Sequence, residues 1–478
     1  MPARPTLRSS APWRVLDGFG SARAASRYAR PDSVDELAEL LARARDEHLP
    51  VTFRGSGRSY GDAALNSRGL VIDVRGLDRM LRWDPEGGIA EMQPGVTIEG
   101  LWRRTLEDGW WPAVVPGTYH PTMGGCVAMN IHGKNCFRVG PYGDHVIDLD
   151  LLTPAGERLT LSRQQRPDVF RAVIGGLGLL GAVTRVKLKL KHVECGSLRV
   201  RPVSCRSFAA MFECFEQHLP DADYLVGWVD CFAGGDGLGR GLVHRADYIA
   251  ASEDPAGRES FHVEKQGLPD RIFGLPRGVL WRLMRPFTND VGMKIVNRLK
   301  YWLPEGGVGP DGTYLQSHVA FAFLLDYVPN WRRAYGDSGF IQYQAFVPDA
   351  TARAAMPELI RLQQRRGIVS YLGVFKRHRA DEFLLSHGLD GWSLALDIPV
   401  NPRRAAELHA LTRDMTKVVL EAGGTFYAAK DAVLEAGEFE RAYGDRLTRF
   451  LEIKRSLDPD GVLLGDQGRR LMPVLAAG

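Results

Sequence analysis

The sequence predicts an α+β protein with two domains. Its 478 residues exceed the ~100–200 residues that one domain usually holds. Helical and strand patterns alternate over roughly the first 190 residues, and the pattern changes near residue 197. Apolar segments at 339–347, 370–376 and 392–398 then predict the strands of a second sheet.

Periodicity and helix-start signals assign the N-terminal elements. A helix is predicted at 34–47, because Ser33 and Glu36 form a capping-box pair ahead of an apolar stripe. Residues 183–191 alternate apolar with basic side chains, which is typical of a strand with one face in water. Further strands are predicted at 51–54, 70–74, 146–153 and 157–161, and a strand–helix unit at 89–107.

The later part of the chain is less regular. Residues 233–312 are interrupted by glycine and proline and show no clear pattern. Helices are predicted at 402–422 and 436–457, and no internal repeat or low-complexity linker is found.

Composition excludes several classes of protein. A net charge of +4, from 61 basic and 57 acidic residues, is too balanced for a dedicated nucleic-acid-binding protein. No stretch approaches the ~18–20 apolar residues of a membrane span. The six cysteines contain no CxxC pair and predict buried thiols in a reducing compartment. We interpret the arginine-rich N-terminus as a basic lead-in and expect a cytoplasmic protein.

Glycine is in excess: 53 of the 478 residues, about 11%, are glycine, against the roughly 7% that is usual. One glycine-rich segment, Arg54–Asp62, directly follows a predicted strand. Its glycines permit positive φ, so successive backbone N–H groups can converge on an anion, and Tyr60 is suited to lie against a planar ring. A hairpin turn is the alternative interpretation. Backbone or side-chain donors in this segment come from Arg54, Gly55, Ser56, Gly57, Arg58 and Ser59.

A second donor-rich segment runs from Pro116 to Tyr142 and is long for a loop inside a domain, which favours a functional role. His132 and Lys134 add two titratable groups to it. The spacing of His120, Cys126, His132 and Cys136 fits no ordinary zinc site, so no metal is expected. Donors suited to a diphosphate are Gly117, Thr118, Thr122, Gly124 and Gly125.

A third segment, GLGLLG at 176–181, matches the dinucleotide fingerprint GxGxxG by its letters. That fingerprint needs a strand before it and a helix after it, so that a helix N-terminus faces the pyrophosphate. Here a helical segment precedes the glycines and the alternating strand follows them, so we reject an NAD site.

Together these segments resemble the FAD-linked oxidases of the vanillyl-alcohol oxidase type. The resemblance extends from residue 54 to residue 431, and IHGKN, FIQYQ and AAKD together are more specific than any glycine-rich loop. It is carried by RGSGRSYGDAALN, VPGTYHPTMGG, IHGKN, RAYGDSGFIQYQ, VFK, GWSLALD and YAAKD.

The resemblance implies a two-domain FAD-linked oxidase fold. Residues 1–196 would form an FAD-binding α+β domain, and residues 197–410 a substrate domain with an antiparallel sheet and covering helices. Residues 411–478 would return to complete the FAD domain and the flavin site. Besides the two donor-rich loops, His132, Asn135, Val183 and Tyr427 would help to hold FAD.

Attachment of the FAD is expected to be noncovalent. Covalent members of the family carry a histidine after the RGxG turn, where this chain has Arg58, and no histidine or cysteine stands at the second attachment position near Gly117. In the catalytic set implied by the family, His132 and Lys430 are alternative bases, Lys134 lies at the reacting carbon, and Lys430 stabilises reduced flavin. Substrate contacts would come from Lys134, Trp228, Gln342, Gln344, Lys376 and Lys430.

The implied reaction is an FAD-dependent oxidation at a sugar CH–OH group. More narrowly, the chain resembles members that oxidise the 2'-hydroxyl of a polyprenyl-phosphoryl-β-D-ribose to the 2-keto sugar. That step is the first half of an epimerisation to the arabinose form for the cell envelope, and an NAD-dependent short-chain reductase would act on the product. Alternatives are an alditol or aldonolactone oxidase, a flavin reductase, and a non-catalytic FAD-binding subunit. Ala395 stands where related enzymes have a cysteine, so the shape of the pocket should differ.

Residues 271–287 combine four arginines with apolar and aromatic residues. A short helix packed on the substrate domain is the favoured interpretation, and contact with an anionic membrane surface is the alternative. Membrane contact would make the protein peripheral at the inner membrane face. A periplasmic location would require an export route that the sequence does not reveal.

Overall fold

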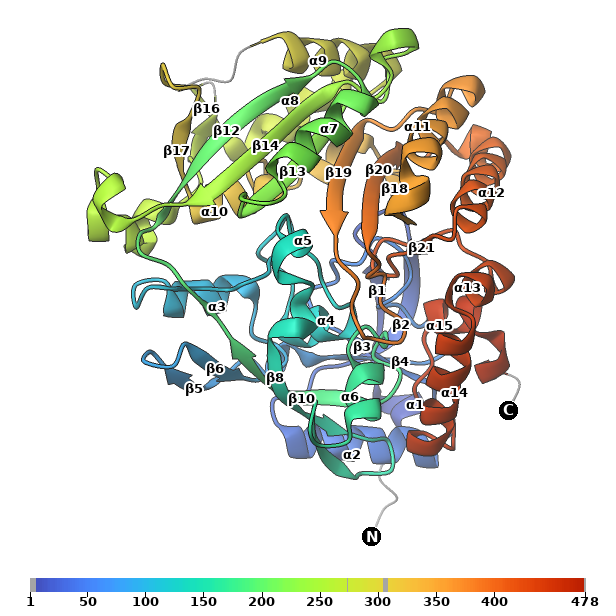
Figure 1. Cartoon of the computed structure of the whole chain (residues 1–478). Coiled ribbons are helices and arrows are strands. Elements are labelled where there is room, and N and C mark those ends of the chain that lie inside the picture. Colours follow the sequence, from blue (N-terminus) through green and yellow to red (C-terminus); the bar gives the residue numbers. More distant parts are fainter. Residues whose placement is uncertain (1–5, 273, 304–307, 477–478) are drawn as a thin grey trace.

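Two sheets form the N-terminal part of the computed structural model, which describes residues 6–272, 274–303 and 308–476 (Figure 1). In the first sheet, of order β1-β2-β4-β3, β4 runs parallel to both of its neighbours. The second sheet, of order β5-β6-β10-β8-β9, is antiparallel. The strands are β1 Trp13–Asp17, β2 Arg23–Ala29, β3 Val51–Arg54, β4 Leu70–Asp73, β5 Met80–Asp84, β6 Ile89–Met92, β8 Val146–Leu152, β9 Arg158–Ser162 and β10 Ala182–Lys189.

The predicted helices of this part are present, and three short helices that were not predicted, α1, α4 and α5, are added to them. Ser33 caps α2 by accepting a hydrogen bond from the backbone N–H of Glu36, as predicted. The segment predicted as a loop between residues 116 and 142 contains two short helices, α4 and α5. The Thr122 side chain caps the first turn of α4 by accepting a hydrogen bond from the N–H of Gly125. The helices are α1 Leu7–Ser10, α2 Val34–Asp46, α3 Ile98–Thr105, α4 Met123–Ala128, α5 Cys136–Val139 and α6 Pro167–Val173.

The GLGLLG segment lies between α6 and β10, so a helix precedes it and a strand follows it. Leu177 and Gly178 both have positive φ, +59° and +72°. The predicted order, a helix before the glycines and a strand after them, is confirmed, and it is the reverse of the order that a dinucleotide fingerprint needs.

An antiparallel sheet of eight strands dominates the second part, in the order β17-β12-β14-β13-β19-β20-β18-β21. The helices α7 Phe208–His218 and α11 Asp349–Arg366 pack against it (Figure 1). This arrangement confirms the predicted antiparallel sheet with covering helices. The strands are β12 Ser197–Cys205, β13 Tyr224–Val229, β14 Gly241–Tyr248, β17 Tyr314–Ser317, β18 Phe340–Pro348, β19 Leu372–His378, β20 Gly391–Pro399 and β21 Thr425–Phe426.

The section without a clear sequence pattern contains β14 and several short elements. Its longest helix, α9 Asp290–Trp302, was not predicted because the residues that the helix buries are Gly292 and Asn297 rather than an apolar stripe. Its short elements include β15 Arg271–Ile272, β16 Leu275–Pro276, α8 Leu280–Met284 and the 3₁₀ turn η8 Arg285–Phe287. After this section come α10 His318–Ala322 and the 3₁₀ turns η9 Leu324–Asp326 and η10 Trp331–Tyr335. Elsewhere, β7 Trp110–Trp111 pairs with β11 Lys191–His192.

The chain then returns to the first sheet. The predicted division at residue 410 falls inside α12, Ala405–Glu421, which packs on α11 and β18. The helix predicted at 436–457 is interrupted at Gly444, where φ is +47°, giving α13 Ala436–Tyr443 and α14 Asp445–Leu457 ahead of α15 Asp466–Leu471. Backbone hydrogen bonds join Val51 of β3 to Val462 and Leu464, so the C-terminal segment is attached to the first sheet.

A buried ion pair holds this attachment. Lys454 and Asp458 are at most 2% exposed, and the Asp458 carboxylate accepts hydrogen bonds from the N–H groups of Val462 (2.9 Å) and Leu463 (2.8 Å). Replacing Asp458 with alanine leaves a buried unpaired ammonium, so we expect the C-terminal segment to lose about 3–5 kcal/mol of stability. Faster amide hydrogen exchange over residues 445–471 would report the loss. The exposed Asp460→Ala should change exchange little, and equal effects of the two variants would contradict the role of the pair.

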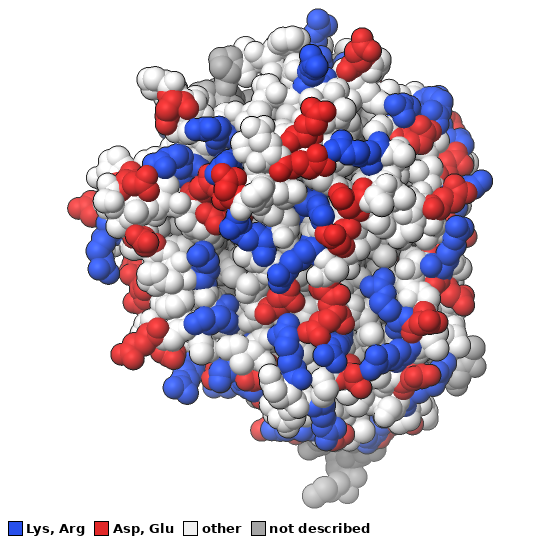
Figure 2. Space-filling model, in the orientation of Figure 1, with Lys and Arg blue, Asp and Glu red and all other residues white. Residues whose placement is uncertain are grey.

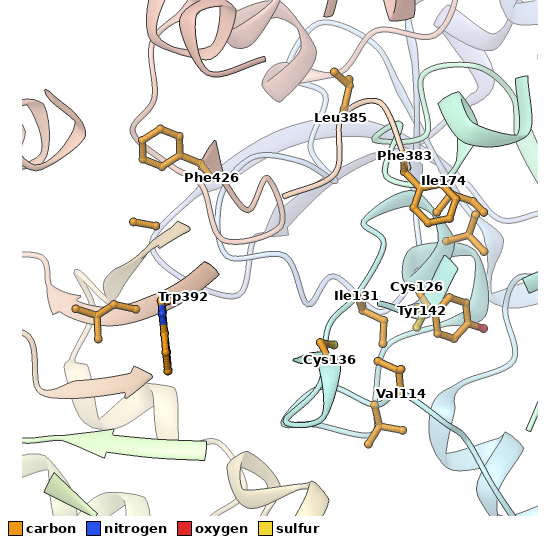
Figure 3. Packing of buried hydrophobic residues seen from close by; sticks show 14 of the residues in the cluster. Val114, Cys126, Ile131, Cys136, Tyr142, Ile174, Phe383, Leu385, Trp392 and Phe426 are labelled. Atoms are coloured by element: carbon orange, nitrogen blue, oxygen red, sulfur yellow. The ribbon is translucent and has the colours of Figure 1, made fainter. Parts of the chain in front are cut away.

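The main hydrophobic core runs through both parts of the molecule. Figure 3 shows Val114, Ile131 and Cys136 grouped together, with Trp392 standing on the large sheet. All six cysteines are buried and free, as predicted. Among the described residues, no group of three or more His, Cys, Asp or Glu side chains is placed to hold a metal ion.

The charged surface shows basic and acidic side chains interspersed over the face drawn in Figure 2. None of the helices in the described part of the chain is long and apolar enough to cross a membrane.

Candidate active site

A cavity of about 460 Å³ lies between the two donor-rich loops and the eight-stranded sheet. Every predicted site residue except Arg54 and Asn135 lines it. Residues from the first loop, β10, β13, β18, β19 and the C-terminal return therefore meet at one place, although Gly55 and Lys430 are about 375 positions apart in the chain.

The first loop follows β3 and is held against the second. A side chain at Gly55 would place its Cβ 2.2 Å from Oγ1 of Thr122, so only glycine allows the two loops to meet there. Gly57 has φ +64°, the left-handed region that glycine tolerates best. Two loops with backbone donors are thereby brought to one end of the cavity.

Arg54 supports this loop and does not line the cavity. Its guanidinium donates hydrogen bonds to the backbone oxygens of Asp17 (2.8 Å) and Ala64 (3.3 Å). Two of the N–H groups of Arg54 are thus bonded within the protein, and its contact with the cofactor stays a prediction. Arg58, three residues past Gly55, does line the cavity, with its guanidinium carbon 5.3 Å from the centre of the Phe19 ring.

The second loop is fastened to the large-sheet domain. The hydroxyl of Thr118 donates to Asp326 (2.9 Å), and the N–H of Leu325 donates to the oxygen of Gly117 (3.1 Å). The Thr118 hydroxyl is thus engaged with a carboxylate and is not a free donor for a diphosphate. Thr122 caps α4, and Gly124 and Gly125 follow it in the first turn of that helix.

Asn135 also departs from its predicted place. Its amide nitrogen donates to the oxygen of Ala113 (2.8 Å), and the side chain lies behind the wall of the cavity. The Cβ of an alanine at Gly133 would lie 2.7 Å from Oδ1 of Asn135. Asn135 therefore shapes the IHGKN turn that presents His132 and Lys134.

Several buried polar atoms at the cavity have no hydrogen-bond partner among the described residues. They are Nε of Arg58, the hydroxyl of Tyr60 and Nδ1 of His132. Buried polar groups are nearly always paired, so these atoms indicate that a polar ligand belongs in the cavity. The donor-rich loops and the unpaired buried polar atoms fit FAD.

Lys430 comes from the C-terminal return and lies beside the first loop. The N–H of Tyr60 donates to the oxygen of Ala429 (2.8 Å), and the ammonium of Lys430 lies 3.6 Å from the centre of the Tyr60 ring. Burial lowers the pKa of Lys430; the Asp397 carboxylate partly offsets this effect, and Lys376 adds to it. A lysine of lowered pKa can exchange a proton near neutral pH.

Asp397 is a site residue that the sequence did not single out. It is 1% exposed and accepts a hydrogen bond from the Gln342 amide, and burial raises its pKa. In the sequence, only its place in GWSLALD could have indicated a role for Asp397. In the structure, the β18–β20 register sets it opposite Gln342. The strand pairing, which the sequence could not specify, makes Asp397 the acidic neighbour of Lys430.

His132 lies in a cluster of neutral rings. Its Nε2 is 3.1 Å from the Gln344 amide nitrogen, and its ring packs on His378 (5.2 Å), His387 (5.0 Å) and Tyr427 (4.9 Å). Burial holds the pKa of His132 well below its ordinary value, and Lys376 lowers it further. His378 and His387 were missed because no sequence spacing links them to His132.

Lys376 and Lys134 form the basic wall of the cavity. Lys376 is on β19, and burial lowers its pKa to about 8. The Lys134 ammonium donates to the oxygen of Phe321, and burial together with Lys376 holds its pKa well below that of an ordinary lysine. Lys300 of α9, which the sequence did not assign, also lines the cavity, 4.6 Å from the centre of the Trp228 ring.

Gln342 and Gln344 both line the cavity, as their spacing of two on a strand predicts. Ala395 lines it opposite Gln344 in the β18–β20 pairing.

The model of the FAD binding domain family matches residues 25–162 of this chain. The fold and the site therefore define an FAD-dependent oxidoreductase. Over 445 residues the chain is 33% identical to the decaprenylphosphoryl-beta-D-ribose oxidase of Mycolicibacterium smegmatis, covering 91% of this chain and 92% of that protein. The chain belongs to the FAD-linked oxidases, in the family of that enzyme.

Other curated proteins match smaller shares of the chain. Cytokinin dehydrogenase 6 of Oryza sativa is 35% identical over 189 residues, 37% of this chain and 36% of that protein. An uncharacterized protein of Streptomyces coelicolor is 28% identical over 384 residues, 79% of this chain.

We expect acid precipitation to release the FAD. Arg58 occupies the position of the attaching histidine, and no cysteine is among the described residues that line the cavity. After precipitation and centrifugation, the flavin absorbance should remain in the supernatant. A yellow pellet that persists on denaturing gel electrophoresis would show a covalent bond instead.

Proposed function

We propose that this FAD-dependent oxidase acts on the 2'-hydroxyl of a polyprenyl-phosphoryl-β-D-ribose and forms the 2-keto sugar. The oxidised carbon loses a hydride and its hydroxyl loses a proton. Bound FAD supplies the acceptor for the hydride. The name of the Mycolicibacterium smegmatis relative, with 33% identity over most of both chains, supports a lipid-phosphate sugar as the substrate.

One observation supports the phosphate most directly. The described residues that line the cavity include Arg58, Lys134, Lys300, Lys376 and Lys430, and no aspartate or glutamate. A wall that carries several cationic groups and no carboxylate concentrates positive potential in the cavity, so the cavity is suited to anions. The donor-rich loops account for one anion, the diphosphate of FAD. The lysines beside the sheet are then available for a second, the phosphate of the substrate.

Lys430 is favoured over His132 as the base. A base is most effective when its pKa lies near the working pH. Burial moves the pKa of Lys430 down from the usual alkaline range, toward neutrality. Burial also lowers the pKa of His132, but this shift is away from neutral pH, so that its ring binds a proton only weakly. His132 then orients the sugar as a neutral hydrogen-bonding group.

Two amides complete the polar wall. Gln342 donates to Asp397, and the Gln344 amide lies between His132 and the hydroxyl of Ser393, at 3.1 and 3.4 Å. Each amide is held by partners behind it, so it presents a fixed group to the sugar. Trp228, packed under Lys300, offers a face for the apolar part of the substrate.

A 2-keto sugar still attached to its lipid phosphate must be reduced to complete an epimerisation. We assign that step to an NAD-dependent short-chain reductase as the partner, in line with arabinose formation for the cell envelope. The product would be tested by adding borohydride to the reaction mixture and looking for the arabinose epimer.

Anaerobic mixing of the holoenzyme with a prenyl-phosphoryl ribose tests the function. Bleaching of the flavin absorbance is expected with this substrate, and none with ribitol, xylitol or an aldonolactone at the same concentration. Bleaching by the soluble polyols alone would favour an alditol or aldonolactone oxidase. No bleaching by any sugar donor would indicate a non-catalytic FAD-binding subunit.

A further inference from the structure

Exposed apolar side chains are concentrated in one region. All large hydrophobic side chains that are exposed in the described part of the chain lie between residues 275 and 324, except Trp13, Val15, Leu81 and Val474. The region comprises α8, η8, α9, β17 and η9. Figure 1 shows α8 and α9 at the top of the view, at the end of the molecule away from α14 and α2. Exposed apolar patches of this kind mark interaction surfaces.

Helix α9 exposes its apolar side chains, whereas an ordinary surface helix buries them. Its buried positions are Gly292 and Asn297, and the amide of Asn297 donates to the oxygen of Tyr371 (3.4 Å). One stripe along the outer side of α9 is between 51% and 71% exposed: Val291, Ile295, Leu299 and Trp302. A helix that faces water with its apolar stripe lacks the partner for which that stripe is suited.

Basic residues surround the stripe. Residues 271–303 contain seven arginines and lysines and one acid, Asp290, whereas the whole chain is nearly balanced. Lys294 and Arg298 flank the stripe and have no carboxylate partner among the described residues. Further exposed apolar groups come from the adjoining Leu283, Met284 and Phe287.

The surface is continuous with the mouth of the active-site cavity. Lys300, on the opposite side of α9 from the stripe, lines the cavity together with Leu324 and Leu325 of η9. Leu324 is 52% exposed, so it belongs both to the cavity wall and to the outer surface. Helix α9 therefore carries the exposed apolar stripe on one side and contributes Lys300 to the cavity wall on the other.

We propose that the surface formed by α8, η8 and α9 docks on the anionic leaflet of a lipid bilayer. An amphipathic helix with basic residues beside its apolar stripe and an aromatic residue at its end is suited to the interface between headgroups and acyl chains. The seven arginines and lysines of residues 271–303 match the charge of anionic headgroups, which favours a bilayer as the occupant of this surface. Docking holds the cavity mouth at the membrane surface. The proposal depends on the exposed surface of α8, η8 and α9 and not on the identity of the substrate.

Co-sedimentation of the full-length holoenzyme with vesicles tests the proposal. One set of vesicles is phosphatidylcholine and the other contains about 30% phosphatidylglycerol, a composition in which basic residues contribute to binding. We expect preferential binding to the anionic vesicles and weaker binding as salt is raised, because the surface charges are screened. Equal binding to both vesicles, or none to either, would overturn the proposal.

Two variants separate the apolar from the basic contribution. Ile295→Ser/Leu299→Ser/Trp302→Ser removes exposed apolar groups, and Lys294→Gln/Arg298→Gln removes two charges; none of these residues lines the cavity. The charge variant should bind anionic vesicles roughly 25-fold more weakly, about fivefold for each basic residue. The apolar variant should lose binding to a similar or greater extent.

The matched control is Val15→Ser/Leu81→Ser, which removes exposed apolar groups on β1 and β5. It should bind as the unaltered protein does. Flavin reduction by a short-chain, water-soluble prenyl-phosphoryl ribose should be unchanged in all three variants, so a failure of docking is distinguished from a failure of the proposed reaction. The surface would belong to a second copy of the chain, and the proposal would be overturned, under three conditions. By light scattering the unaltered protein would be a dimer and the apolar variant a monomer. The unaltered protein would also fail to bind either kind of vesicle.

Discussion

Replacing Lys430 with glutamine is expected to lower the rate of flavin reduction by substrate about 10²–10⁴-fold, the range for losing a positioned general base. The FAD content of the purified variant should be unchanged, because the two donor-rich loops do not depend on the Lys430 ammonium. The measurement is anaerobic stopped-flow reduction with a saturating prenyl-phosphoryl ribose. Lys417→Gln, on the exposed surface of α12, is the control and should react as the unaltered protein does.

The pH dependence distinguishes the two candidate bases. A base acts only after it has lost its proton, so with Lys430 the rate should rise with pH through the lowered pKa of this lysine and then level off. The pKa of His132 is held well below its ordinary value by burial, so a His132 base would already be free at pH 6. A rate that is flat from about pH 6 to 9 would contradict the assignment to Lys430.

The second large effect is expected at Lys376. Hydrogen bonds to charged groups contribute about 1.5–3 kcal/mol, so Lys376→Gln should weaken binding of a phosphate-bearing substrate roughly 10–150-fold. The change should appear in KM or Kd more than in the limiting rate, because the phosphate is remote from the oxidised carbon. Titration of the holoenzyme by flavin fluorescence measures it.

The charge of Lys376 can be tested separately from its size. Burial lowers the pKa of Lys376 to about 8, so the side chain is cationic below that pH and loses its charge as the pH rises above it. Substrate affinity should therefore decline above about pH 8 in the unaltered protein. Lys376→Arg, which stays charged, should keep its affinity in that range. An affinity that declines equally in both proteins would assign the effect to another group.

Neighbouring residues in the chain account for the parts of the site that the sequence predicted. The turn after β3 needs Gly57 for its positive φ, and the glycines at 176–181 could be judged by the helix before and the strand after them. Gln342 and Gln344 share a face because strand side chains alternate. Each inference concerns backbone geometry over fewer than ten residues, which local sequence constrains strongly.

Arg54 and Asn135 show the limit of such reasoning. Both are polar residues in donor-rich segments, and both were assigned to the cofactor. In the structure, N–H groups of both side chains are bonded to the oxygens of Asp17, Ala64 and Ala113, so both support the turns from behind. Residue type identified a hydrogen-bonding group, and the direction of its side chain depended on which backbone oxygens the fold placed nearby.

By itself the sequence determined the class of the protein: an α+β fold, two glycine-rich loops, and, through the resemblance of widely spaced motifs, an FAD-linked oxidase. Only the tertiary structure decided that Asp397 lies beside Lys430, that Lys300 reaches the cavity, and that α9 turns its apolar stripe outward. The physical reason is that loops and strands are specified by local backbone preferences. Charge pairing, burial and exposure depend instead on which distant segments pack together, and that packing lowers the pKa values of Lys376 and Lys430.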